Sequence, residues 1–121
     1  MDLGVIAKNL PFMLGGLILT FELALITIVG GFTLGLILAA GRLSSRGWLY
    51  YPTSSYVHFF RGLPLILVIF WIYFLSPMIT GRSVGAFHAA MVSFIAFEAA
   101  YFAEIIRAGI QSISRGQAMA A

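Results

Sequence analysis

Two carboxylates, Glu98 and Glu104, stand in an apolar run that leads into a short polar segment at the end of the chain. An ionisable group inside a bilayer is costly, so such residues indicate more than anchoring. At about 100° per helical residue, the two carboxylates point roughly 120° apart and cannot form a paired acid/base site by themselves. Glu104 and Arg107 stand at i and i+3, which predicts a structural ion pair. Glu98 has no cation nearby in the sequence, so we interpret it as a candidate pathway residue.

Glu22 lies about ten residues into the first apolar run and is the other intramembrane carboxylate. It could line a pathway, or it could pair with another helix and be hydrogen-bonded or protonated there; the sequence leaves both open. His58 and His88 lie in different runs, and the sequence contains no metal-binding, triad or phosphate-loop pattern around them. We therefore expect no catalytic residue, no metal and no cofactor bound by this chain, and no ATP hydrolysis.

The composition indicates an integral membrane protein, because 61% of the 121 residues are hydrophobic and only 9% are charged. Soluble domains carry about 25% charged residues. The net charge of +3 comes from scattered cations, which argues against a nucleic-acid surface. Cysteine is absent, which excludes disulfides and thiolate metal sites in this sequence.

Three apolar runs predict an all-α membrane protein with spans at about 12–40, 56–75 and 84–106. Pro64 is tolerated in a first helical turn, so we expect a bend at Arg61-Gly62, near one membrane face. Gly31 and Gly35 form a GxxxG pattern that permits close helix approach, although this signal is weak.

The distribution of Lys and Arg predicts the orientation of these spans. Alternating spans leave Lys8 and Arg82 on one side, and on the other side Arg42, Arg46, Arg61, Arg107 and Arg115. The positive-inside rule then places residues 1–11 outside the cytoplasm and residues 107–121 in the cytoplasm.

Three motifs resemble the permease subunits of ATP-binding-cassette importers for polar amino acids. They are Arg42-Leu43-Ser44-Ser45, Phe60-Arg61-Gly62-Leu63-Pro64-Leu65, and the stretch from Glu98 to Ile113. The last motif is the most specific, and it looks most similar to the glutamate/aspartate importer permeases. The similarity covers about residues 12–121.

This resemblance implies a type-1 importer permease fold of five or six transmembrane helices, of which three would be present here. It also implies that residues 12–121 form an incomplete transmembrane domain, the N-terminal half of a permease. Its EAA loop would begin within residues 107–121, with Met119 where the family often has Glu. The segment expected to couple to an ATPase comprises Ile110, Gln111, Ser112, Arg115, Gly116 and Gln117.

The function implied by the resemblance is ATP-driven, binding-protein-dependent import of an amino acid, glutamate or aspartate, across the cytoplasmic (inner) membrane. The expected partners are a separate ATPase subunit, a second permease subunit, an extracytoplasmic amino-acid-binding protein and membrane lipid. Glu22, Glu98 and Glu104 would repel an acidic substrate unless they are protonated, paired or turned away. Arg61, at the cytoplasmic mouth, is a candidate pathway residue that could offset this repulsion.

Two alternatives remain from the sequence. The substrate could be another polar amino acid, such as glutamine, histidine or a basic amino acid; the intramembrane carboxylates favour a cationic substrate on electrostatic grounds. The chain could instead be a membrane scaffold that only packs helices and transports nothing.

Overall fold

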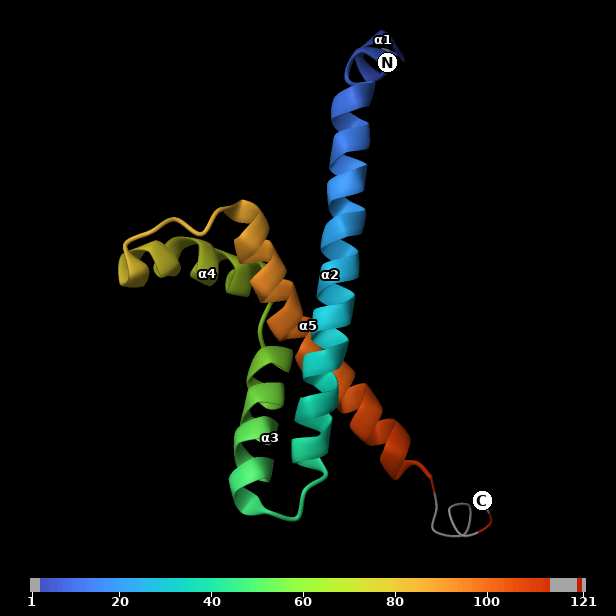
Figure 1. Ribbon diagram of the computed structural model, residues 1–121, viewed down its shortest axis with the longest axis vertical. Coiled ribbons are helices and arrows are strands. Elements are labelled where there is room, and N and C mark those ends of the chain that lie inside the picture. The colour runs from blue at the N-terminus through green and yellow to red at the C-terminus, as the bar shows by residue number, and fades with distance from the viewer. Residues whose placement is uncertain (1–2, 114–119, 121) are drawn as a thin grey trace.

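The computed structural model describes residues 3–113 and 120, and this part of the chain is built from five helices joined by short connections (Figure 1). They are α1 (Leu3–Lys8), α2 (Leu10–Arg42), α3 (Gly47–Arg61), α4 (Leu65–Thr80) and α5 (Ala86–Gln111). Helices α2 and α5 are each long and apolar enough to cross a membrane. The expectation of an all-α membrane fold is confirmed for these residues.

Helix α2 is the long axis of the molecule, and α5 crosses it obliquely (Figure 1). With 33 residues it is about 50 Å long, which exceeds the roughly 30 Å of a hydrocarbon core. It has a proline, Pro11, in its first turn, where the missing N–H breaks no helical hydrogen bond.

The segment expected as one span at 56–75 forms two helices, α3 and α4, which are bent by 103° at the intervening break. Pro64 explains this break, because it has no N–H to donate and it disfavours a helical conformation at Leu63. Helix α3 begins already at Gly47, so the aromatic cluster around Trp48 and Tyr51 is helical. If the bent pair counts as one span, the described residues contain three candidate spans.

Helix α5 extends to Gln111, about five residues beyond the span expected at 84–106. The side chains of Arg107 and Gln111, at i and i+4, are hydrogen-bonded to each other along this extension. The first residues of the expected cytoplasmic segment therefore continue the helix.

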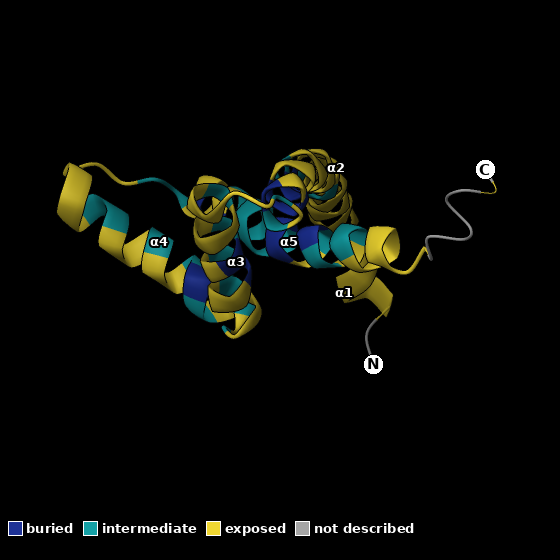
Figure 2. Ribbon diagram, turned by 90° about the horizontal axis from the view of Figure 1, so that it is seen from below, coloured by how far each residue is buried: buried dark blue, intermediate teal, exposed yellow. Residues whose placement is uncertain are grey.

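The core lies where α2, α3 and α5 meet, as the buried residues in Figure 2 show. It consists mainly of small and aliphatic side chains: Leu38, Ala39, Val57, Ala99, Ala100 and Ala103. A Cβ atom added to Gly35 would lie 2.7 Å from the Cβ of Phe102, and one added to Gly31 would lie 3.0 Å from the Cβ of Glu98. The GxxxG pattern thus lies within the contact surface of α2 with α5.

Helix α3 is attached to α5 by a polar contact as well, because the Tyr56 hydroxyl donates a 2.8 Å hydrogen bond to the Ala96 carbonyl. By contrast, α4 projects sideways and is exposed along most of its length (Figure 2). Met78 and Ile79 are 80% and 83% exposed. Such apolar exposure suits contact with lipid or with further helices.

Candidate functional site

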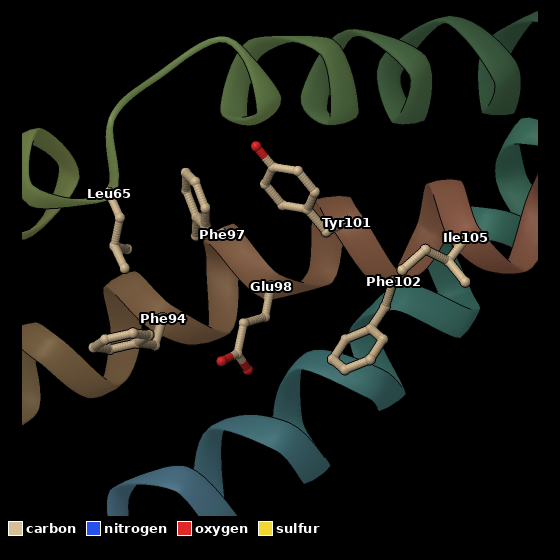
Figure 3. Close-up of a pocket in the computed structure, with 7 residues that line it drawn as sticks. All are labelled: Leu65, Phe94, Phe97, Glu98, Tyr101, Phe102 and Ile105. Carbon is tan, nitrogen blue, oxygen red and sulfur yellow. The ribbon is translucent and has the colours of Figure 1, made fainter. Parts of the chain in front are cut away.

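Glu98 lines two hollows on the surface of α5. The larger, of about 480 Å³, is formed by α5 and the first residue of α4 and is lined by Leu65, Phe94, Phe97, Glu98, Tyr101, Phe102 and Ile105 (Figure 3). The smaller, of about 200 Å³, lies toward α2 and is lined by Thr20, Leu23, Ala24, Thr27, Phe94 and Glu98. Glu98 and Phe94 are therefore shared by both hollows.

The Glu98 carboxylate points toward α2, with Phe94 and Phe102 to its two sides (Figure 3). Its Oε2 atom is buried and has no hydrogen-bond partner among the described residues. A buried acceptor of this kind is costly to leave unpaired. A carboxylate flanked by aromatic rings can bind an organic cation such as an ammonium group, through charge and through the faces of the rings.

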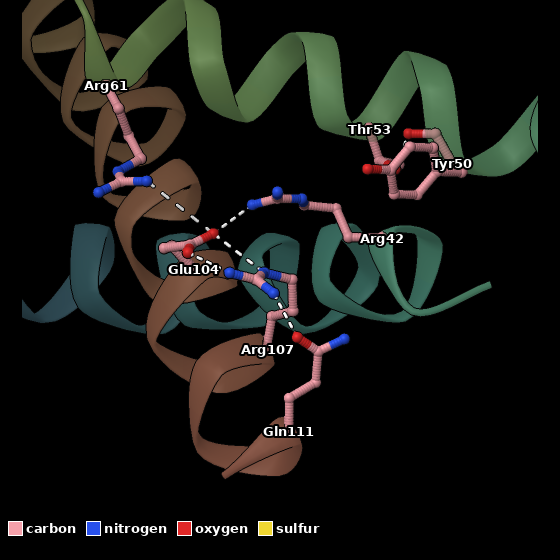
Figure 4. A network of polar contacts seen from close by, with 7 residues as sticks. All are labelled: Arg42, Tyr50, Thr53, Arg61, Glu104, Arg107 and Gln111. Carbon is pink, nitrogen blue, oxygen red and sulfur yellow. Dashed lines mark hydrogen bonds and ion pairs between the residues drawn. The ribbon is translucent and has the colours of Figure 1, made fainter.

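Glu104 is the centre of a second polar group, the arginine cluster, which we define as Arg42, Arg61 and Arg107 around this carboxylate (Figure 4). The expected contact with Arg107 is present, with Nη2–Oε1 and Nε–Oε2 distances of 2.5 and 3.2 Å. Arg42 also donates to Oε2, and the Arg61 Nη1 atom lies 3.9 Å from it.

The sequence did not predict that Arg42 and Arg61 would join this pair. Each is the last residue of its helix. The sequence indicated only that both lie on the same side of the membrane, from the distribution of Lys and Arg. Arg61, a candidate pathway residue, lies beside Tyr101 and Glu104 and is not among the residues that line either Glu98 hollow.

Glu22, the remaining candidate, is exposed on α2 and lines neither of the two Glu98 hollows. The structure therefore does not bring it together with Glu98, and its role as a pathway or helix-pairing residue stays a prediction. His58 and His88 are both exposed. Within residues 3–113 and 120, no group of three or more His, Cys, Asp or Glu side chains could hold a metal ion.

The expected coupling segment is described only in part. Ile110 and Gln111 form the end of α5, and Ser112 follows as its C-cap. All three are exposed. Arg115, Gly116 and Gln117 lie outside the described residues.

Long apolar helices that carry carboxylates are typical of membrane transport proteins, and the similar proteins belong to that class. No family model matches the chain. The chain is 42% identical to the glutamate/aspartate import permease protein GltK of Escherichia coli O157:H7, over 99% of its own length and 57% of the relative. It is 35% identical to the arginine transport system permease protein ArtQ of Bacillus subtilis, over 100% of its length and 55% of the relative.

A solved structure agrees with these relatives. The crystal structure of an amino acid ABC transporter with histidines superposes with a TM-score of 0.91 at 36% identity, over 100% of this chain and 56% of the other. The chain is thus a homologue of amino-acid ABC permeases, as its motifs indicate, and it spans about half the length of the relatives it matches. Its helices correspond to part of such a permease.

Proposed function

We propose that this chain is part of the membrane permease subunit of an ATP-driven, binding-protein-dependent amino-acid importer. The TM-score of 0.91 with an amino acid ABC transporter is the observation that best supports this. In this proposal, ATP is hydrolysed on a separate subunit, a second permease subunit completes the pathway, and an external binding protein delivers the substrate. The N-terminus lies outside and the segment after Arg107 lies in the cytoplasm, as the positive-inside rule predicts.

The proposal is tested with the subunit that carries this chain, reconstituted in vesicles with its ATPase and binding protein. We expect ATP-dependent uptake of an amino acid, and we expect Arg115→Glu to weaken the coupling of hydrolysis to uptake, because it reverses a charge in the expected coupling segment. Lys8→Glu, the same charge reversal at the end of α1, is the matched control and should behave as wild type. Normal coupling in Arg115→Glu would contradict the role of this segment, and absence of any uptake with the wild type would favour the scaffold alternative.

The substrate we propose is an amino acid of the polar class, with glutamate or aspartate suggested by GltK. The similarity to ArtQ, and to a probable glutamine ABC transporter permease protein GlnM of B. subtilis at 35% identity, keeps basic and neutral substrates as the alternative. Glu98 bears on both cases, because every amino acid carries an α-ammonium group. We propose that this group is the cation that Glu98 receives, which removes the objection that a carboxylate repels acidic substrates.

Glu98→Gln should therefore reduce uptake about tenfold, the loss expected for one charge-assisted hydrogen bond. Initial uptake rates of labelled glutamate, glutamine and arginine measure this effect, and Glu98→Asp, which keeps the charge, is the control. An equal reduction for all three substrates supports recognition of the α-ammonium group. A reduction confined to arginine indicates recognition of a cationic side chain, and unchanged rates would remove Glu98 from the pathway.

A further inference from the structure

The bend between α3 and α4 is directly connected to α5 through Arg61. This residue is the last of α3, four positions before the first residue of α4. The Arg61 guanidinium lies 5.7 Å from the centre of the Tyr101 ring, and the Tyr101 hydroxyl donates a 3.4 Å hydrogen bond to the Arg61 carbonyl. The Arg61 side chain also faces Glu104 in α5 (Figure 4). The contacts of Arg61 with Tyr101 and Glu104 therefore hold the start of the bend against α5.

The Glu104 oxygen nearest Arg61, Oε2, already accepts two hydrogen bonds from other arginines. Oε2 accepts from both Arg42 and Arg107, and Oε1 accepts from Arg107. Arg61 is left 3.9 Å away, which is beyond hydrogen-bonding distance. In the arginine cluster, three positive charges surround one negative charge. Arg61 and Arg107 are therefore competitors for the same carboxylate.

The competitors differ in how freely they can move. The Arg42 side chain is only 8% exposed, whereas those of Arg107 and Arg61 are 24% and 39% exposed. Arg107 also donates to the Gln111 side chain at the end of α5 (Figure 4). A bend or unwinding of α5 beyond Glu104 that displaces Gln111 would draw Arg107 away from Glu104 and leave an acceptor for Arg61.

We propose that Glu104 is an exchange point: displacement of the coupling segment at Gln111 withdraws Arg107, Arg61 takes its place, and the bend between α3 and α4 changes. This inference rests on the proposed function, in which an ATPase moves that segment. Leu65, the first residue of α4, lines the larger hollow beside Glu98. A change in the bend therefore also changes the shape of that hollow.

The bend can be measured in the assembled transporter by electron spin resonance between labels at the far ends of α3 and α4. Tyr51 and Ile79 are 69% and 83% exposed, and residues 1–121 contain no cysteine of their own; cysteines elsewhere in the complex are replaced before labelling. The doubly labelled complex without nucleotide and with bound ATP gives two reference distances. We expect Arg107→Gln without nucleotide to shift the population ratio about tenfold toward the ATP-bound distance, the effect of one charge-assisted hydrogen bond gained by Arg61.

Arg61→Gln should act in the opposite direction and hold the ATP-bound complex at the nucleotide-free distance. Gln111→Ala, at an exposed position, removes the contact through which the coupling segment withdraws Arg107, so it too should hold the ATP-bound complex at the nucleotide-free distance without endangering the fold. Lys8→Gln, which removes an exposed charge from α1, should leave both distances unchanged.

Opposite shifts from the two arginine variants support the exchange. Arginines that act only as a static brace would loosen the bend alike when either is removed, and that result overturns the proposal, as does a bend that no variant or nucleotide changes. Uptake by the unlabelled wild-type complex is measured separately. A transporter that imports amino acids while its bend stays fixed disproves the exchange and leaves the proposed function intact.

Discussion

Glu104→Gln is expected to lower the unfolding free energy of the subunit by about 3 kcal/mol, the low end for breaking a buried ion pair. The substitution leaves Arg42, Arg61 and Arg107 close together without their shared carboxylate. Arg42 is the most affected, because its side chain is 8% exposed and its Nε atom is already buried without a hydrogen-bond partner among the described residues. We place the effect at the low end because the Glu104 side chain is 21% exposed.

Thermal unfolding of the purified complex measures this loss. Glu22→Gln is the matched control: the same change on the exposed surface of α2 should alter stability by about 0.5 kcal/mol or less. Equal unfolding temperatures for the two variants would show that the arginine cluster contributes nothing to the packing of α2 and α3 against α5.

Gly35→Leu should also lower the unfolding free energy by about 3 kcal/mol, but here the cause is a steric clash rather than a lost ion pair. A single Cβ at this position already falls 2.7 Å from the Phe102 Cβ and 3.2 Å from the Ala99 carbonyl oxygen. The backbone of α5 cannot yield as a flexible side chain would, so α2 and α5 must separate. Gly16→Leu, on the same helix, is the control, because a Cβ at Gly16 meets nothing within 4 Å.

The yield of assembled complex and its unfolding temperature report the separation of the two helices. Both should fall for Gly35→Leu and remain near the wild-type values for Gly16→Leu. If the two leucine variants behave alike, the GxxxG pattern is not the crossing point that the structure indicates.

Sequence patterns predicted the helical class, because long apolar runs match the thickness of a bilayer. The Glu104–Arg107 contact also followed from sequence, since i, i+3 neighbours share a helix face. The contacts of Arg42 and Arg61 with Glu104 did not, because they depend on how three separate helices end beside one another. Long-range proximity of this kind leaves no periodicity in a single sequence.

The second span shows the same limit. Pro64 indicated a bend, but neither its 103° angle nor the early start of α3 at Gly47 could be predicted from the residue types around them. The two hollows beside Glu98 could not be predicted from the sequence either, because their walls come from α2, α4 and α5 together. The family motifs, in contrast, were local, and the similarity they indicated is confirmed over nearly the whole chain.

Helix α4 has one buried residue, Val68, along its full length from Leu65 to Thr80. The break at Pro64 connects it to α3. At its other end, Gly81 terminates the helix with a positive φ of 75° and leads on to α5. Since few apolar contacts oppose its detachment, α4 belongs to the part of the chain with the lowest local stability. Its exposed apolar side chains must therefore be covered by lipid or by protein surfaces other than those of α2, α3 and α5, so we expect α4 to reach its fixed position late in assembly.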